Sequence, residues 1–506
     1  MNIDVTWLWR ALLVIAVGLH SAALGFQAGT EFYVEPDWQG PAQGSASRPW
    51  VRLDGAAWQT IDQALAEGPV TVYFSARQTG ADRNQATEHA LNILRNDPGP
   101  HRLLLDGKSR YNSSDSNPSW SSYSGNSRFE IEASYPVSTI NNSAPYPPRD
   151  YWTLRGFRLI ATNGQVIYLG HASHVIIEDN ELSHRPSTQH GPGLGVASPG
   201  QNFGSSITIR NNVLHDIYGE GIYVAGYYDQ APGFPAGNDL LIEGNLIYDL
   251  GRPGGEPDGI DIKDGWTGVV IRGNTVYMSS PNSGRDGIIT NSAAVIEENF
   301  VYNMGRDGIT LTSTYSDHDG FWREAVIRYN VVVGCGANPS YIWGFGIHIP
   351  NNSSSYTFIR PKVYNNTVYG TRHQTAGQAV GIGVGQGYGS TVDLYNNIVA
   401  DSDGFALHAG AGRLSNHRNN LFYAPQGGTL VRYGSNNFGA ASIQDFESDA
   451  LSQNPLFLDT SLPYQMDNFN LRSDSPAAGR DMGAFPSQAP TPSAPGAPTG
   501  LREISN

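Results

Sequence analysis

The sequence contains one cysteine, few charged residues and no excess of basic ones. Cys335 alone excludes an internal disulfide framework, and its apolar surroundings predict a buried small side chain. Charged residues make up 15% of the chain, and 46 acidic against 31 basic residues give a formal net charge of −15. No basic cluster is dense enough to neutralise a nucleic-acid backbone. We therefore expect no nucleic-acid partner, and binding of an acidic polymer would need a local cation or metal.

Long apolar runs are also nearly absent. The run at residues 7–19 is interrupted by Arg10, is short for a membrane span, and is followed by Ala23-Leu24-Gly25, which is typical of a signal cleavage site. We interpret residues 1–25 as a signal peptide, with a membrane anchor as the alternative. The protein is therefore expected to be secreted or periplasmic, with no membrane span after cleavage.

Long amphipathic helical patterns are missing, whereas glycine is abundant, with 59 residues. Together with 11% aromatic residues and asparagine-rich turns, this composition favours β-structure. At 506 residues the chain exceeds the usual size of one compact core. Several domains or one elongated repeat fold are therefore expected.

From about residue 150 the sequence repeats short phrases that end in asparagine, such as TIRNN, VIRGN and LYNN. Their irregular spacing fits a solenoid whose coils share strands but differ in loop length. An asparagine in the same turn of each coil can bond its neighbours and form a ladder. Propeller blades and leucine-rich repeats are poorer fits, because their own strand and leucine patterns are missing. We predict an all-β fold, a right-handed parallel β-helix. The asparagines are Asn180, Asn212, Asn245, Asn274, Asn299, Asn330, Asn366, Asn397 and Asn420.

A second set of phrases, each with a central glycine, predicts how the coils stack. Like residues on neighbouring parallel strands lie about 4.8 Å apart, so aligned phrases give columns of side chains. One column points inward and contains Ile222, Ile260, Ile288, Ile309, Ile347, Ile382 and Phe405. A second column points outward and contains Tyr223, Asp261, Ile289, Thr310 and His348. A third, just before the glycine, contains Glu220, Asp258, Asp286 and Asp307.

The two ends of the solenoid have their own signals. Residues 31–34 predict an opening strand and residues 59–66 a short helix that caps the first coils. Residues 487–506 begin with a Pro/Ala/Ser-rich stretch and are expected to be a linker or disordered tail. We therefore predict one β-helix domain over residues 30–486.

The stretch 256–264, EPDGIDIKD, contains four carboxylates and one lysine in nine residues. Carboxylates repeated at one strand spacing repel one another unless a cation lies among them, and hard oxygen ligands suit Ca²⁺. We predict a Ca²⁺ site. The alternative is that Asp before Gly is only turn chemistry. The predicted metal ligands are Glu256, Asp258, Asp286 and Asp307.

Lys263 would normally stay protonated among these acids. If a metal takes up their charge and substrate excludes water, the amine could act as a base. This arrangement suits β-elimination from a uronic acid polymer, in which the C5 proton is removed as the C4–O bond breaks. The alternative is a surface salt bridge from Lys263 to Asp261, Asp264 or Glu256.

The motif around Lys263 resembles two families of polysaccharide lyases, and the ends of the chain resemble secreted, pectate lyase-like β-helix proteins. Glu256-x-Asp258 with Lys263 resembles family 6, the alginate lyases and chondroitinase B, which implies Ca²⁺-binding acids and a lysine base. The arginine of that family falls on Asn291 here. Asp258-Gly259 followed one coil later by Asp286-Gly287 resembles the Ca²⁺-dependent pectate lyases of family 9. In this chain the further aspartate of that pattern is Ile289, and its lysine column holds Thr310.

Several further residues are candidates for the site. His348 lies in the column of Asp261 and could serve as an acid or base, or as a ladder residue. Arg285 and Arg306 could meet substrate carboxylates, although pairing with Asp286 and Asp307 is an alternative. We predict catalytic roles for Lys263, Asp261, His348 and Arg285. Substrate binding is predicted for Tyr223, Asn291, Arg306 and Thr310.

These observations predict a secreted, monomeric polysaccharide lyase that acts on an acidic, uronate-containing polysaccharide with Ca²⁺. A β-helix glycoside hydrolase with paired carboxylates and a C5-epimerase are the enzymatic alternatives. A non-catalytic carbohydrate-binding β-helix is the third, because a fold alone does not determine function.

Overall fold

The computed structural model describes most of the chain between residues 29 and 485. The described ranges are 29–75, 91–94, 99–112, 119–122, 128–139, 149–170, 172–186, 191–196, 204–226, 237–251, 257–281, 283–312, 325–350, 361–375, 377–385 and 391–485. The predicted signal peptide, the predicted tail and Glu256 lie outside these ranges, so the predictions made for them stay predictions.

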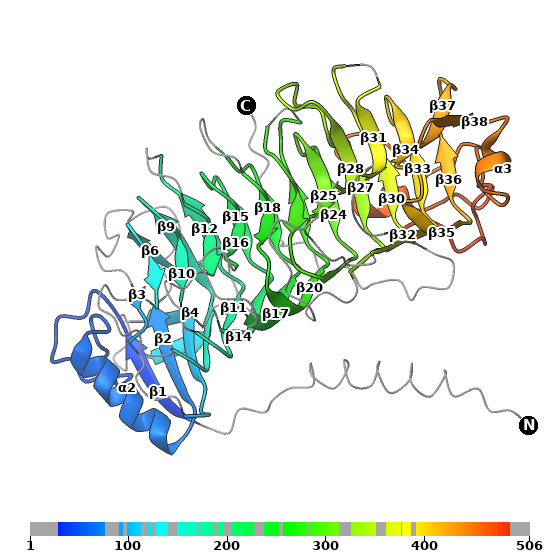
Figure 1. Cartoon of the computed structure of the whole chain (residues 1–506). Helices are drawn as coiled ribbons and strands as arrows, with labels where there is room; N and C mark the ends of the chain where they lie inside the picture. Colours follow the sequence, from blue (N-terminus) through cyan, green and yellow to red (C-terminus); the bar gives the residue numbers. More distant parts are fainter. Residues whose placement is uncertain are drawn as a thin grey trace, which may run out of the picture.

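Within the described residues, three long sheets run side by side along one axis (Figure 1). Apart from two strands that pair antiparallel with a neighbour, successive strands in each sheet come from successive coils and are parallel, and a complete coil contributes one strand to each sheet. Parallel crossover connections are right-handed. The fold is therefore the predicted right-handed parallel β-helix.

Sheet I has 14 described strands: β1 (Thr30–Val34), β2 (Val70–Ser75), β4 (Leu103–Asn112), β5 (Ser119–Ser122), β8 (Trp152–Arg155), β11 (Ile176–Glu178), β14 (Ser205–Arg210), β17 (Gly237–Glu243), β20 (Trp266–Arg272), β23 (Ala294–Glu297), β26 (Val326–Arg328), β29 (Lys362–Tyr364), β32 (Val392–Tyr395) and β35 (Leu414–Arg418).

Sheet II has 13 described strands: β3 (Leu91–Asn92), β7 (Val137–Ser138), β10 (Ile167–Leu169), β13 (Leu194–Val196), β16 (Ile222–Val224), β19 (Ile260–Ile262), β22 (Ile288–Thr290), β25 (Asp307–Leu311), β28 (Gly344–Ile349), β31 (Ala379–Val384), β34 (Phe405–Ala409), β37 (Thr429–Tyr433) and β38 (Asn436–Gly439).

Sheet III has 11 described strands: β6 (Phe129–Ala133), β9 (Phe157–Ala161), β12 (Glu181–His184), β15 (Val213–His215), β18 (Leu246–Tyr248), β21 (Thr275–Tyr277), β24 (Phe300–Tyr302), β27 (Val331–Val333), β30 (Thr367–Tyr369), β33 (Ile398–Ala400) and β36 (Leu421–Tyr423).

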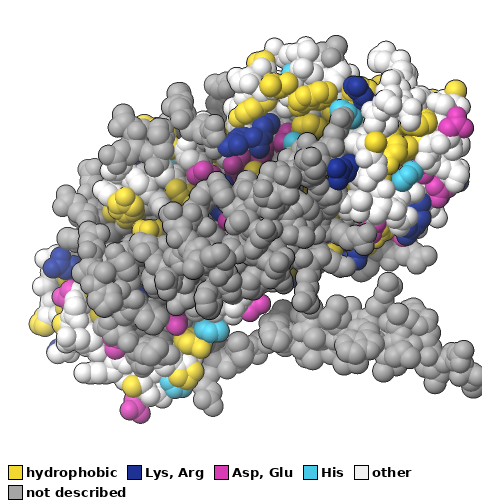
Figure 2. All heavy atoms as spheres, in the orientation of Figure 1, with side chains coloured by type: hydrophobic (Ala, Val, Ile, Leu, Met, Phe, Trp, Pro, Cys, Tyr) yellow, Lys and Arg dark blue, Asp and Glu magenta, His cyan; other side chains and the backbone are white. Residues whose placement is uncertain are grey.

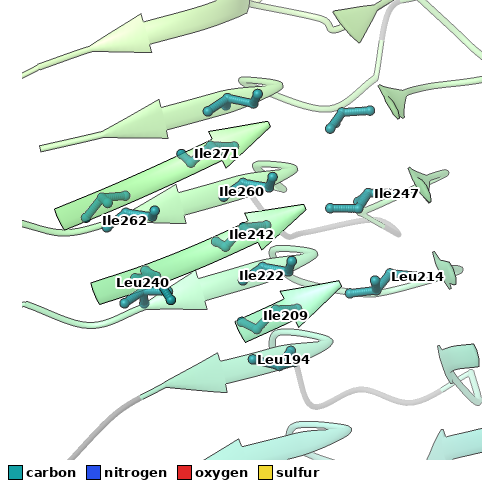
Figure 3. Close-up of a cluster of buried hydrophobic side chains, with 14 of the residues drawn as sticks. Leu194, Ile209, Leu214, Ile222, Leu240, Ile242, Ile247, Ile260, Ile262 and Ile271 are labelled. Atoms are coloured by element: carbon teal, nitrogen blue, oxygen red, sulfur yellow. The ribbon is translucent and has the colours of Figure 1, made fainter. Parts of the chain in front are cut away.

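Aliphatic side chains from the three sheets fill the interior in rows along the axis (Figure 3). In sheet II, Ile222 pairs with Ile260, and the row continues as predicted to Ile382. The prediction for Phe405 was wrong, because Ile382 pairs with Leu407, whereas Phe405 pairs with Val380. The free energy of apolar burial along this row stabilises the coils.

The predicted asparagine ladder is confirmed. The Oδ1 atom of Asn299 accepts hydrogen bonds from the backbone N–H and the side-chain Nδ2 of Asn274, both at 3.0 Å. The same pair of bonds joins each neighbouring asparagine from Asn180 to Asn420. At the end of the ladder, Glu447 accepts the two bonds from Asn420 at 2.7 and 2.9 Å. All of these side chains are buried, so the ladder satisfies polar groups that would otherwise be costly inside the fold.

Helix α2 (Gly55–Glu67) covers the N-terminal end of the coils, as predicted, and is longer than residues 59–66 (Figure 1). Asp54 caps it by accepting hydrogen bonds from the N–H groups of Ala56 and Ala57. Its Trp58, Ile61 and Leu65 are buried in the core. None of the helices in the described part of the chain has the length and apolar character of a membrane span.

The other end is closed differently. Strand β38 pairs antiparallel with β37, and the short helix α3 (Ile443–Phe446) packs beside it. The chain then runs back along the outside of sheet III through the 3₁₀ helix η1 (Met466–Phe469). Phe457 and Phe469 in this segment bury apolar side chains of β24, β27, β33 and β36 in a second, smaller core.

Candidate functional site

The acidic column predicted from the sequence lies at the turns that lead into β16, β19, β22 and β25 of sheet II. The N–H groups of Gly221, Gly259 and Gly287 donate to the carbonyl oxygens of Asp258, Asp286 and Asp307, respectively, at 2.8–3.0 Å. A Cβ atom at Gly259 would lie 2.4 Å from the Gly287 oxygen, so only glycine lets successive coils approach this closely. The repeated Asp-Gly pairs therefore place one carboxylate per coil at the same height on the sheet.

These carboxylates lie beneath the surface rather than on it. Asp258, Asp286 and Asp307 are exposed to only 3%, 0% and 2%. Asp258 Oδ1 accepts the backbone N–H of Asp286 at 2.9 Å. Burial and the neighbouring Asp286 raise the pKa of Asp258 well above its ordinary value. Burial and Asp307 raise the pKa of Asp286 to about 6, although Arg306 opposes this shift.

Glu220 continues the acidic column by one coil toward the N-terminus. Burial raises the pKa of its carboxyl group, and the charge of Asp261 acts in the same direction. The acidic column therefore begins at Glu220, near Asp261, and ends at Asp307.

The outward column of Tyr223, Asp261, Ile289, Thr310 and His348 is confirmed by the strand register. Lys263 Nζ lies 2.7 Å from Asp261 Oδ2. The salt bridge weighed as an alternative for Lys263 is therefore present. The other oxygen of Asp261, Oδ1, is buried and has no hydrogen-bond partner among the described residues.

The charge of Asp261 controls the protonation of Lys263. Burial by itself lowers the pKa of Lys263, but the charge and hydrogen bond of Asp261 outweigh this, and the pKa is raised. Burial likewise raises the pKa of Asp261, and Lys263 opposes that shift. The Lys263 amine also lies 5.7 Å from the centre of the Tyr223 ring. An amine and a phenol thus share one corner of the site.

Arg306 reaches back by one coil to Asp286. Its Nε donates to Asp286 Oδ1 at 2.7 Å, and its Nη2 donates to Asp286 Oδ2. The same Nε lies 3.6 Å from Asp307 Oδ2. Burial lowers the pKa of Arg306, but these two carboxylates outweigh it and raise the pKa. The pairing that was weighed for Arg306 is therefore present, and its predicted contact with substrate stays a prediction.

Arg285 lies one coil before Arg306, and its carbonyl oxygen accepts the Arg306 N–H at 2.9 Å. Burial is the main reason why the pKa values of Asp258 and Asp261 are raised, and the positive charge of Arg285 partly opposes both shifts. The backbone of Arg285 therefore lies directly beside that of Arg306, in the coil that carries Asp286.

Asp307 and His348 form a pair that the sequence pattern did not suggest. His348 Nδ1 lies 2.9 Å from Asp307 Oδ2, and the Thr310 hydroxyl donates to the same oxygen at 3.2 Å. The backbone N–H of Phe345 donates to Asp307 Oδ1 at 3.1 Å. The imidazole also stacks on the Phe345 ring, with centres 3.8 Å apart. This pair could have been found from the sequence. In the column of residues that precede the glycine, Phe345 is one coil after Asp307, and His348 lies three residues after Phe345.

The site thus has two layers, with carboxylates underneath and cationic or aromatic groups above. The side chains of Lys263, Arg306 and His348 are exposed to 19%, 20% and 22%, whereas their acidic partners are almost fully buried. Figure 2 shows this face of the molecule, where Lys and Arg atoms lie beside Asp and Glu atoms and hydrophobic atoms lie close by. A ligand that approaches the described residues meets positive charge first.

The remaining predicted residues lie deeper. Asn291 is buried, and its N–H donates to the Ile262 oxygen at 2.8 Å, one coil beyond Lys263. Thr310 is buried against Asp307. Their predicted contacts with substrate stay predictions.

The carboxylates do not fit a Ca²⁺ site by themselves. Asp286 is held by Arg306, Asp307 is held by His348 and Thr310, and Asp258 accepts a backbone N–H. In the described part of the chain, no three His, Cys, Asp or Glu side chains are placed to hold a metal. Ca²⁺ prefers six to eight oxygen ligands. The calcium prediction therefore depends on Glu256 or other residues outside the described ranges, and it stays a prediction.

Comparison with known proteins agrees with the fold. The family described as "Right handed beta helix region" matches residues 200–376, which is less than half of the chain. No curated protein is matched by the sequence.

Solved structures show only a distant likeness. An alginate lyase from Paenibacillus sp. str. FPU-7 is 16% identical with a TM-score of 0.39, and the match covers 66% of this chain and 96% of that one. The pectate lyase Pel9A is 14% identical with a TM-score of 0.41, covering 93% and 95%. The A-module of the Azotobacter vinelandii mannuronan C-5 epimerase AlgE6 is 12% identical with a TM-score of 0.41, covering 79% and 95%. Likenesses this distant do not assign an activity to the chain.

Proposed function

We propose that the protein is a secreted or periplasmic, monomeric polysaccharide lyase that cleaves a uronate-containing glycan by β-elimination. The observation that supports this most directly is the layering of the site. Lys263 and Arg306 are partly exposed and pair with carboxylates that are almost fully buried, so the groups of these pairs that meet a ligand are cations. A surface of this kind is complementary to a polymer that carries one carboxylate per sugar.

In the proposed reaction, Arg285 pairs with the carboxylate of the reacting sugar and makes its C5 proton more acidic. The neutral amine of Lys263 removes that proton. The C4–O bond breaks, and its electron pair leaves with the oxygen while a C4=C5 double bond forms. The Tyr223 phenol gives its proton to the leaving oxygen, and exchange with solvent afterwards restores both side chains. Arg306 binds the carboxylate of a neighbouring sugar as a charged hydrogen-bond donor.

The buried acids act on this reaction through their partners. Asp261 holds the Lys263 amine at 2.7 Å, and Asp286 holds the Arg306 guanidinium by two hydrogen bonds. Each fixes the position of a group that would otherwise lose side-chain entropy on binding substrate. We therefore regard them as positioning residues. No step of this proposal passes through a metal ion.

The burial of the carboxylates argues against the alternative of a glycoside hydrolase. That reaction needs two carboxyl groups that flank the scissile bond. Among the described residues of the site, Asp258, Asp261, Asp286 and Asp307 all lie beneath the surface, with exposures of 3% or less, and Glu220 is the one partly exposed member of the acidic column. A C5-epimerase would use the same proton abstraction and differs only in the fate of the C5 anion, so product analysis separates it from a lyase.

The test is a spectrophotometric assay with polymannuronate, polyguluronate, polygalacturonate and glycosaminoglycans, each with CaCl₂ and with EDTA. A lyase produces unsaturated ends that absorb near 235 nm. We expect absorbance to rise with at least one polymer for the wild type and to stay flat for Lys263→Ala. Asp474→Asn serves as a matched control, because Asp474 is an exposed acid in the C-terminal segment that pairs, among the described residues, only with Arg472.

Two results would contradict the proposal. Proton exchange at C5 without any new absorbance would identify an epimerase. Full turnover by Lys263→Ala, with circular dichroism unchanged, would place the base elsewhere.

A further inference from the structure

A group of aromatic side chains continues the site along sheet II toward the C-terminus. We call this group the aromatic patch and define it as Trp343, Phe345, His348, Phe405, His408 and Arg432. These residues lie on or beside β28, β34 and β37, which are neighbours in sheet II together with β31. The patch therefore faces outward on the same sheet that carries the acidic column.

The rings of the patch contact one another in a continuous series. Trp343 lies 6.2 Å from Phe345 and 5.6 Å from His408, measured between ring centres. His408 lies 5.5 Å from Phe405, and the Arg432 guanidinium lies 5.8 Å from the Phe405 ring. Burial and the charge of Arg432 lower the pKa of His408, so this ring is neutral at neutral pH.

A glycine makes room for the ring at the start of the patch. Gly383 occupies the outward column between His348 and His408. A Cβ atom there would lie 2.4 Å from two atoms of the Phe345 ring. Any other residue would therefore displace the ring, whereas glycine lets it lie flat against β31. Beside the patch, Ile342 is exposed to 73%, which extends the apolar surface.

His348 joins the patch to the site already described. One face of its imidazole stacks on Phe345, and its Nδ1 bonds to Asp307. Neighbouring strands lie about 4.8 Å apart, so Asp261 to His348 spans about 14 Å and His348 to Arg432 about another 14 Å. A ligand that follows the sheet from Lys263 thus passes over stacked rings and reaches a further cation, Arg432.

We propose that the aromatic patch is a binding subsite for further pyranose rings of the same acidic glycan. The C–H faces of the sugars stack on Trp343, Phe345 and Phe405, and Arg432 pairs with a uronate carboxylate at the far end. The negative faces of aromatic rings attract C–H groups, and rigid aromatic side chains lose little entropy on binding. The identity of the ligand rests on the proposed function, and the subsite makes long chains the preferred ligands.

The test compares long and short oligosaccharides without turnover. In a Lys263→Ala background, titration calorimetry measures the Kd of tetramers and decamers of mannuronate, guluronate and galacturonate. We expect decamers to bind more tightly than tetramers. Trp343→Ala and Phe405→Ala should each weaken decamer binding by about tenfold, the usual effect of removing an aromatic anchor, and so reduce the advantage of length. Trp343→Phe should retain most of this advantage.

Leu458→Ala is the matched control, because Leu458 is an exposed apolar residue outside sheet II, in the segment that packs on sheet III. Melting temperatures show whether each variant is folded. An unchanged ratio of tetramer to decamer Kd in folded Trp343→Ala and Phe405→Ala would overturn the inference, as would no binding of any oligomer. If the 235 nm assay is negative but the length advantage depends on these rings, the subsite stands and the lyase proposal fails.

Discussion

The contact between Asp261 and Lys263 leads to a prediction about the pH dependence of the reaction. Asp261 lies 2.7 Å from the amine and is the main reason why the pKa of Lys263 is raised. Asp261→Asn keeps the size of the side chain but removes its charge. The pKa of Lys263 should then fall, because burial, which favours the neutral amine, is no longer opposed by this carboxylate.

The size of the effect follows from the distance and the burial. An opposite charge in direct contact shifts a pKa by about 1–3 units. The base of the proposed reaction is the neutral amine, so kcat/KM should rise with pH until Lys263 has lost its proton. In Asp261→Asn this rising limb should move to lower pH by about 1–3 units. The variant should therefore gain activity relative to the wild type at neutral pH, even if its maximum rate is lower.

The assay is the initial rate of absorbance near 235 nm at low substrate concentration, followed across the pH range in which the protein stays folded. Asp474→Asn again controls for the loss of one negative charge and should leave the profile in place. Lys263→Ala should have no rising limb. A profile of Asp261→Asn that stays in place or moves to higher pH would refute the assignment of Lys263 as the base.

Three further predictions follow from the fold and the site. Asn299→Ala removes the acceptor of a buried N–H and the donor to the Ile271 oxygen. It should therefore lower the free energy of unfolding by about 3–5 kcal/mol in urea titrations. The control Asn437→Ala, at an exposed position, should change this free energy by less than about 0.5 kcal/mol. The pKa of Glu181 is lowered to about 2: burial opposes this shift, and the bonds and charges of His215 and Arg158 outweigh it. A lowered carboxyl pKa contributes stability above its unfolded value near 4.5 that is lost as pH falls toward 2, so Glu181→Gln should cost roughly 2–3 kcal/mol at pH 5 and almost nothing at pH 2. The calcium prediction requires that CaCl₂ raise the melting temperature and that Glu256→Gln abolish the rise; an equal rise in both proteins would place the metal away from Glu256.

Features that repeat once per coil could be predicted from the sequence. The asparagine ladder was predictable because each coil places the same side chain at the same turn, where only its neighbours can satisfy it. The columns of Ile260 and Asp261 were predictable for the same reason, because parallel strands in register align like residues. These repeated positions are enough to predict the fold class, and the prediction does not depend on the loops.

The error at Phe405 shows where this reasoning fails. The phrase SDGFALH contains the Asp-Gly pair of the earlier coils, but Gly404 belongs to the turn and Ala406 occupies the position that Gly381 and Gly346 hold elsewhere. A shift of two residues keeps side chains on the same face, so the alternation of apolar and polar residues does not reveal it.

The sequence also could not predict that the carboxylates of the site lie beneath the cationic side chains. The sequence shows that Asp286 and Arg306 are close in their coils, but not which of them lies above the other. That order depends on how far each side chain extends from its turn, and long cationic side chains keep their charged ends near water while short carboxylates remain below. Glu447, which lies outside every repeat, completes the ladder through tertiary packing alone.

The carboxylate that accepts the last two ladder bonds has a consequence for how these molecules behave in a crowded solution. A stack of parallel coils offers an open edge at each end, and such an edge is a template on which another copy could grow into a fibre. Here Glu447 occupies the place of the next amide, β38 reverses the strand direction, and α2 covers the opposite end. A second molecule would have to bury the Glu447 carboxylate and pair with a strand of the wrong polarity. Stacking therefore stops within one chain, and a protein built from a pattern that could repeat without limit keeps a finite length.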